Sequence, residues 1–217
     1  MTIEKINSIN DIMIGILTVA YLNLLWIIFT IAGFGFFTIG PATYAMMKYY
    51  DRWLRLKEKP RITKNFWRYF KERYRQSLFI SWIALALFTI VIVNLFSLPQ
   101  WYYQAANVIV FVILTFSFSH VYTVMAATKF TTIKEIIRNS AMLGLSYLHY
   151  SIIAWTIIVA SYLLASKYSP ALLFIFGIGF FGFVLAFFGK IILLEFTPKE
   201  EDAFEENETE DSSVIAH

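Results

Sequence analysis

The sequence predicts an all-α membrane protein, a bundle of five transmembrane helices with amphipathic helices at its cytoplasmic interface. Of the 217 residues, 59% are hydrophobic and only 15% are charged, whereas soluble domains carry roughly a quarter charged residues. Five segments reach the length of about 20 mostly apolar residues that a membrane-spanning helix needs. The links between these segments differ strongly in charge, which indicates how the chain is oriented in the membrane.

The five predicted spans are residues 12–39, 77–98, 105–128, 141–165 and 170–194. They form a single integral membrane domain over residues 12–195, after a short extracytoplasmic N-terminus at 1–11. The first apolar run is too long for the core of a signal peptide and lacks a small-residue cleavage site. We therefore expect this run to be retained as a span.

Positive charge is concentrated in the first and third links. The first link, residues 40–76, holds eleven Lys and Arg against three Asp and Glu, and residues 129–140 hold three against one. The link around residues 97–104 holds no charge. Because links rich in Lys and Arg stay cytoplasmic, we expect a multi-pass protein of the cell membrane with its N-terminus outside and its C-terminus inside.

The C-terminal segment, residues 196–217, carries eight acidic residues and one Lys. An acidic run of this kind is normally disordered and solvated, so the sequence predicts a disordered cytoplasmic tail. The alternative is that the tail contacts the basic first link, which is expected on the same side of the membrane.

Two amphipathic helices are predicted in the first link, on either side of Pro60. In each helix, basic residues recur at steps of three or four on one face and aromatic residues occupy another. Such helices lie in the headgroup region, where anionic lipids attract the basic side chains. The candidate residues for docking on lipid or on a partner are Lys48, Arg52, Arg55, Lys64, Arg68, Lys71, Arg75, Trp53 and Trp67. A connector that only fixes the topology is the simpler interpretation, and docking of a cytoplasmic partner is the more specific one.

Polar residues inside the predicted spans are few, and none of them is acidic. The candidates among them are Asn23, Asn107, His120, Tyr122 and Lys190. A transporter needs ionisable or polar groups at depth, so a small transporter or permease-like subunit with a polar site in the bundle is the alternative function. For Asn23 and His120, a hydrogen bond between neighbouring helices is the more common role.

The sequence contains no residue pattern that indicates catalysis or cofactor binding. The three His, at positions 120, 149 and 217, are isolated, whereas a metal site needs clustered ligands. The chain has no cysteine, which excludes thiolate catalysis and Cys-based zinc sites. Gly177, Gly179 and Gly182 have the G-x-G-x-x-G spacing but lie inside an apolar span, where glycine suits close helix packing. We therefore expect a protein that is not an enzyme and that holds no cofactor or metal.

A resemblance to the YesL-like family of bacterial membrane proteins rests on several segments of the sequence. They are YLNLLWIIF from Tyr21, TIGPATYAMMKYYDRWLR from Thr38, FWRYFKERYRQS from Phe66 and TTIKEIIRNSAMLG from Thr131. The resemblance covers roughly residues 5–195. The family has no assigned function, and its members are associated with sugar importers and sensor kinases. The resemblance therefore implies a link to carbohydrate uptake.

The residues and the resemblance together predict a non-catalytic accessory or regulatory membrane protein of a carbohydrate-uptake system. Its expected partners are the anionic lipids of the inner leaflet, a membrane transporter or sensor kinase, and a second copy of the chain. Nucleic acid is not an expected partner, because a link so rich in Trp and Phe is expected to lie in the membrane surface.

Overall fold

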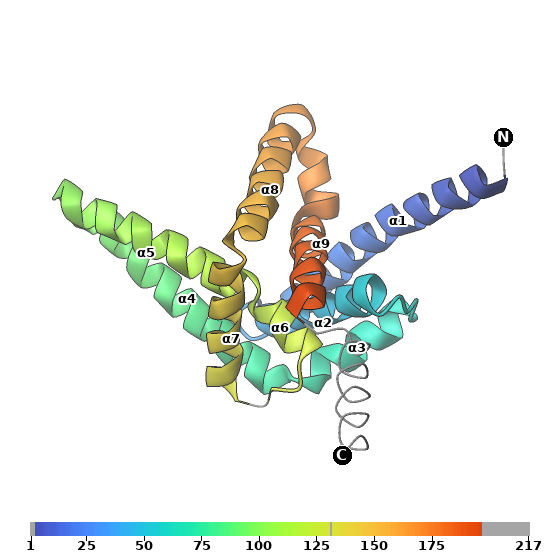
Figure 1. The fold of residues 1–217 in the computed structure, drawn as a ribbon, viewed down its shortest axis with the longest axis horizontal. Helices are drawn as coiled ribbons and strands as arrows, with labels where there is room; N and C mark the ends of the chain where they lie inside the picture. The colour runs from blue at the N-terminus through green and yellow to red at the C-terminus, as the bar shows by residue number, and fades with distance from the viewer. Residues whose placement is uncertain (1–2, 131, 197–217) are drawn as a thin grey trace, which may run out of the picture.

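The computed structural model describes residues 3–130 and 132–196, and within these ranges the chain is helical without any strand (Figure 1). The elements in chain order are α1 (Ile3–Ala32), α2 (Ile39–Tyr50), the π-helical turn η1 (Asp51–Arg55), α3 (Ile62–Glu72), α4 (Tyr74–Ser97), α5 (Trp101–Ser119), α6 (Val121–Ala127), α7 (Ile133–Ser146), α8 (Leu148–Tyr168) and α9 (Pro170–Phe196). Beyond Phe196, the predicted acidic tail lies outside the described residues.

Five of the described helical segments are long and apolar enough to cross a membrane, which confirms the predicted five-helix membrane protein. These segments are Ile9–Ala32, Tyr74–Ser97, Trp101–Ala127, Leu148–Tyr168 and Pro170–Glu195. Prolines mark two of their ends. Pro170 opens α9, where its missing N–H needs no partner. Leu98 is extended ahead of Pro99 and ends α4.

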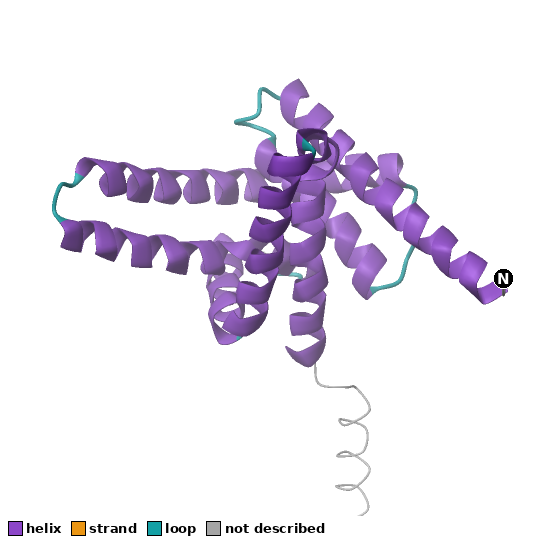
Figure 2. Cartoon of the chain, turned by 90° about the horizontal axis from the view of Figure 1, so that it is seen from above, coloured by secondary structure: helices purple, strands orange, loops and turns teal. Residues whose placement is uncertain are grey.

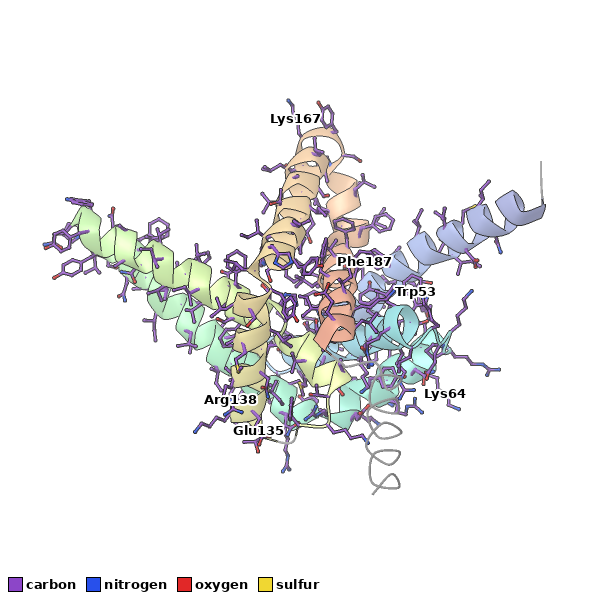
Figure 3. All side chains as sticks on the ribbon, viewed as in Figure 1. Trp53, Lys64, Glu135, Arg138, Lys167 and Phe187 are labelled. Carbon is purple, nitrogen blue, oxygen red and sulfur yellow. The ribbon has the colours of Figure 1, made fainter. Side chains whose placement is uncertain are left out.

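Three arms extend from a central group of shorter helices (Figure 1). The arms are α1, the α4–α5 hairpin and the α8–α9 hairpin, and we call the centre, made of α2, η1, α3, α6 and α7, the hub. Seen from above, α1 and the α4–α5 arm extend to opposite sides (Figure 2). Lys167 lies at the tip of the α8–α9 arm, whereas Lys64 and Arg138 lie at the opposite end of the molecule (Figure 3). Both basic links therefore lie at the hub end.

Helix α2 is buried at the centre of the hub, which corrects the prediction of a surface helix at this position. Nine of its twelve residues are buried, and it contacts α1, α4, α6 and α9. Small residues allow this close approach: a Cβ atom added at Gly40 would lie 2.3 Å from the Ser77 carbonyl oxygen of α4. The side chains of Tyr44 and Met46 are fully buried. The apolar face of α2 therefore packs against protein.

Two of the predicted spans are interrupted. The third, expected as one helix over 105–128, starts earlier at Trp101 and breaks at His120, whose ψ is 5°. The fourth, expected over 141–165, is divided at Tyr147 into α7 and α8. The first ends at Ala32 instead of residue 39, because Phe34 and Gly35 adopt positive φ angles of 58° and 68° and turn the chain into α2.

Candidate functional site

Two basic residues of the first link, Lys48 and Arg73, donate hydrogen bonds to carbonyls at the C-terminal end of α6. Lys48 donates a hydrogen bond from Nζ to the Ala126 carbonyl at 2.7 Å. Arg73 donates to the carbonyls of Met125, at 2.8 Å, and Phe130. The last carbonyls of a helix have no intrahelical donor and carry partial negative charge, so cations stabilise them. Lys48 and Arg73 therefore hold the helix assembly together.

Burial modifies the chemistry of Lys48. Loss of solvent around its ammonium group lowers the pKa of Lys48, and the nearby carboxylates of Glu72 and Asp51 oppose this shift. The Lys48 ammonium therefore interacts with groups of the same chain, namely the Ala126 carbonyl and the two carboxylates. Lys48 was predicted as a docking residue, and the structure places it in the hub contact with α6 instead.

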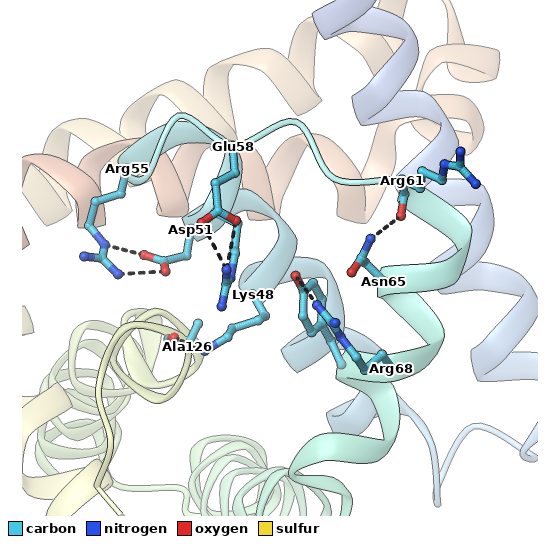
Figure 4. Close-up of polar contacts among 10 residues, drawn as sticks. Lys48, Asp51, Arg55, Glu58, Arg61, Asn65, Arg68 and Ala126 are labelled. Atoms are coloured by element: carbon cyan, nitrogen blue, oxygen red, sulfur yellow. Dashed lines mark hydrogen bonds and ion pairs between the residues drawn. The ribbon is translucent and has the colours of Figure 1, made fainter.

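Arg52 and Arg55 also form ion pairs within the link, and Figure 4 shows the pair of Arg55 with Asp51. Arg55 makes a two-pronged ion pair with the buried carboxylate of Asp51, at 2.6 and 2.9 Å. Arg52 pairs with Glu58 at 2.8 Å across the turn that follows η1. Trp53 packs against Phe183 of α9, with ring centroids 6.0 Å apart. The first half of the predicted docking stripe therefore stabilises the link itself.

Helix α3 presents the second half of the stripe to its surroundings. It buries Phe66, Tyr69 and Phe70. Residues on its other side are exposed, and we call them, with the first basic residue of α4, the α3 face: Lys64, Trp67, Arg68, Lys71 and Arg75. The Lys71 ammonium lies 4.1 Å from the centroid of the Trp67 ring, a cation–π contact at the surface. The α3 face is therefore an accessible basic and aromatic surface.

The two basic links meet in space. Arg73, between α3 and α4, donates to the Phe130 carbonyl in the α6–α7 link. Three exposed basic residues lie in or just after the α6–α7 link, namely Lys129, Lys134 and Arg138. In the sequence, these residues indicate the orientation of the chain, and their three-to-one charge excess is also the signal of a second basic surface. No sequence signal indicated the contact of Arg73, because its partners Met125 and Phe130 are far away along the chain.

Asn23 joins α1 to α9. Its Nδ2 atom donates to the carbonyls of Phe174 and Ile175, each at 2.9 Å, and its Oδ1 atom accepts from the Gly179 N–H at 3.0 Å. The side chain is 2% exposed. Both donor positions and one acceptor position of this amide are bonded to the neighbouring helix, so Asn23 has a structural role between the spans.

His120 joins the break after α5 to α8. Its Nε2 atom lies 3.0 Å from Ser151 Oγ, and both side chains are buried. Ser151 is also within hydrogen-bonding distance of the Gly144 carbonyl in α7. Nearby, Ser140 of α7 donates to the Ser117 carbonyl of α5 at 2.6 Å. These contacts hold the two interrupted spans side by side.

The remaining intramembrane candidates have separate surroundings. Tyr122 lines a small cavity of about 170 Å³ together with α2 and α4 residues. Asn107 donates to the Tyr103 carbonyl of its own helix at 2.9 Å. Lys190 is half-buried on α9, and Glu195, near the end of the same helix, accepts a hydrogen bond from Tyr150 at 2.8 Å. The structure does not bring these side chains to one place with Asn23 and His120.

A groove of about 740 Å³ lies between α1, α8 and α9. It is mainly apolar and includes Asn23, Trp26, Val159, Tyr162, Leu163 and Phe174. The amide of Asn23 is already bonded to α9, and the Tyr162 hydroxyl donates to the Gly177 carbonyl at 2.6 Å. The groove therefore suits an apolar group better than a polar solute. Across the described residues, no group of three or more His, Asp or Glu is placed to hold a metal ion.

Comparisons with known proteins find matches to proteins of unknown function. Residues 19–95, from α1 to α4, match the family described as "Protein of unknown function, DUF624". The uncharacterized protein YteU of Bacillus subtilis (strain 168) is 28% identical over 162 residues, 72% of this chain and 72% of YteU. The uncharacterized protein YesL of the same strain is 28% identical over 142 residues, 64% of this chain and 68% of YesL. No solved structure matches the chain. These matches confirm the predicted resemblance to the YesL-like family, and both the matched family and the two relatives are of unknown function.

Proposed function

We propose that this chain is a non-catalytic accessory or regulatory membrane protein that docks through the α3 face. The observation that carries the proposal is that some basic residues of the first link are bonded within the chain, whereas others are exposed. Lys48, Arg52 and Arg55 are engaged by other groups of the chain. The basic residues of the α3 face lie exposed beside Trp67. A basic and aromatic surface of this kind attracts anionic headgroups and acidic protein surfaces.

The α3 face would lie at the inner membrane surface. Both basic links lie at the hub end of the molecule (Figure 3), and links rich in Lys and Arg stay cytoplasmic. The YesL-like resemblance supports a sugar importer or its sensor kinase as the partner. In this arrangement the α3 face is accessible both to lipid headgroups and to a cytoplasmic domain of the partner, which compete for the same residues.

A comparison of two triple variants tests the proposal. The first variant combines Lys64→Gln, Arg68→Gln and Lys71→Gln on α3. The matched control combines Lys129→Gln, Lys134→Gln and Arg138→Gln, which removes the same charge from the same end of the molecule. Each protein is purified from native membranes in mild detergent, and sugar-importer subunits and sensor kinases are quantified by mass spectrometry.

The proposal expects the α3 variant to recover at least about tenfold less partner than the control, since a loss of about 1.4 kcal/mol corresponds to tenfold in affinity. Equal recovery by wild type and the α3 variant would refute docking through this face. An equal loss in both variants would show that total charge, and not the α3 face, attracts the partner.

The alternative of a small transporter has less support. It requires polar side chains that converge on one cavity. Asn23 and His120 are instead bonded to neighbouring helices, and Asn107 is bonded to its own helix. The large groove beside Asn23 is mainly apolar.

A further inference from the structure

Three exposed basic residues surround one hydrogen bond at the hub end. Arg73 donates to the Phe130 carbonyl and so joins the start of α4 to the α6–α7 link. Lys71 and Arg75 lie two residues to either side of Arg73, and Lys129 precedes Phe130. All three side chains are exposed. The Arg73–Phe130 contact therefore makes one continuous basic surface out of two links that are distant in sequence.

This basic surface extends along α7 and around α3. Lys134 and Arg138 add exposed positive charge on α7, and Lys64 adds it on α3. Arg138 and Lys64 lie at the same end of the molecule (Figure 3). The exposed acidic residues near it are Glu72, Glu135 and, in the final turn of α9, Glu195. Positive charge is thus in clear excess, and the surface attracts an anionic segment.

The last helix ends beside this surface. Leu193, in the final turn of α9, lines a small cavity of about 140 Å³ together with Thr128 and Phe130 of the α6–α7 link. Phe130 is the residue that Arg73 contacts. The described part of the chain therefore ends next to the basic surface.

The sequence beyond α9 has the complementary charge. All eight of its acidic residues fall within residues 200–211, and Lys199 is its single basic residue. At about 3.5 Å per residue, the 21 residues after Phe196 reach up to about 70 Å, enough to cover the hub end. A segment tethered so close to its target has an effective concentration in the millimolar range, so many weak ion pairs suffice for binding.

We infer that the acidic segment at residues 200–211 binds the basic surface of α3, α4 and the α6–α7 link in the same chain. This deepens the proposed function, on which it rests, because it names what covers the α3 face when no partner is bound. A partner or an anionic leaflet then competes with the segment for the same cations. The contact depends on several exposed charges, so salt weakens it.

Zero-length cross-linking of the full chain tests this inference. The protein is placed in nanodiscs of zwitterionic lipid without any partner, and a carbodiimide couples carboxylates to neighbouring Lys amines. We expect cross-links from residues 200–211 to Lys71, Lys129 or Lys134. Lys167 is an amine at the far tip of the α8–α9 arm and is the matched control (Figure 3). The yield at the hub should exceed that at Lys167 at least about tenfold, and it should fall several-fold between about 0.05 M and about 0.5 M salt as the Debye length shrinks.

Mixing isotopically light and heavy copies separates contacts within one chain from contacts between chains. Absence of the hub cross-links, equal yield at Lys167, or cross-links only between copies would each overturn the inference. Anionic lipid in the nanodiscs should lower the yield, and an unchanged yield would overturn the competition. These results do not depend on partner recovery. If the α3 variant loses the partner but no hub cross-links form, the inference is wrong and the proposed function still holds.

Discussion

At the residue scale, the basic side chains of the first link have two different roles. Lys48 and Arg73 donate to carbonyls at the end of α6, whereas Lys64 and Arg75 are exposed. A cation that reaches a helix C-terminus supplies both a missing hydrogen bond and a favourable charge. The position of a cation relative to a helix end, and not its charge alone, decides what it does.

Arg73 and Arg75 form a matched pair for testing this distinction. Arg73→Gln should lower the free energy of unfolding by about 1.5–3 kcal/mol, because it removes charged hydrogen bonds to two carbonyls. Arg75→Gln should change it by less than about 0.5 kcal/mol, as is usual for an exposed side chain. Thermal or denaturant unfolding of the purified proteins in detergent measures both. Equal stability of the two variants would contradict the capping role.

The contacts of Arg73 could not be predicted from the sequence. Its partners Met125 and Phe130 are 52 and 57 residues away along the chain. The local pattern of basic and aromatic residues around Arg73 is the same whether its guanidinium meets lipid headgroups or a helix end. The α3 residues follow the same local pattern and do lie exposed, so the pattern identified the segment but not the role of each cation.

At the element scale, close contacts between helices depend on particular small residues. A Cβ atom at Gly179 would lie 2.7 Å from the Val19 carbonyl oxygen and 2.8 Å from Asn23 Cβ, both on α1. This agrees with the sequence expectation of close helix packing for Gly179, and Gly182 is similarly tight, whereas Gly177 has no such contact. The Gly179 N–H also donates to Asn23, so the approach of the two backbones and the hydrogen bond support each other.

Two glycines on α9 provide a test of this contact. Gly179→Ala should destabilise the protein by about 1–3 kcal/mol, because the added methyl group overlaps the backbone of α1 and cannot be relieved by a side-chain rotation. For Gly177→Ala, the nearest atom is Asn23 Oδ1 at 4.0 Å. This control should be neutral or slightly stabilising, since Ala favours a helix by about 1 kcal/mol over Gly. The free energy of unfolding of both variants is measured in the same detergent. A Gly179→Ala protein as stable as wild type would show that α1 and α9 separate easily.

The sequence predicted the five long helices well and the short ones poorly. An apolar run of about 20 residues is a local property, and it identifies a span without knowledge of its neighbours. The break at Tyr147 has no Pro or Gly at the break itself. It accompanies tight packing nearby, where a Cβ at Gly144 would lie 2.2 Å from the Phe116 carbonyl oxygen of α5. The burial of α2 likewise depends on contacts with helices far along the chain.

At the scale of the whole molecule, the three arms leave much apolar surface uncovered. Large apolar residues are exposed along the α4–α5 arm, including Phe96, Ile109 and Ile90. In water this surface would favour aggregation, whereas lipid or a second copy of the chain covers it without cost. The charged hub and the apolar arms therefore belong in different surroundings.

Single cysteines can test the orientation, because the chain has none of its own. Lys167→Cys, at the tip of the α8–α9 arm, should react with a membrane-impermeant maleimide in intact cells. Lys64→Cys and Arg138→Cys, at the hub end, should react only after the membrane is permeabilised. The cysteine-free wild type is the control. Labelling of the hub positions in intact cells would reverse the proposed orientation.

The α4–α5 arm also has a mechanical consequence. It is fixed at its base, where Gly40 meets Ser77 and Gly144 meets Phe116, and it projects freely beyond (Figure 2). Its 24-residue α4 helix is about 36 Å long, so a tilt of roughly 10° at the base moves the tip by about 6 Å. The arm is therefore a lever that magnifies small displacements at its pivot. Any event at the hub that rocks this pivot would be amplified at the opposite membrane surface.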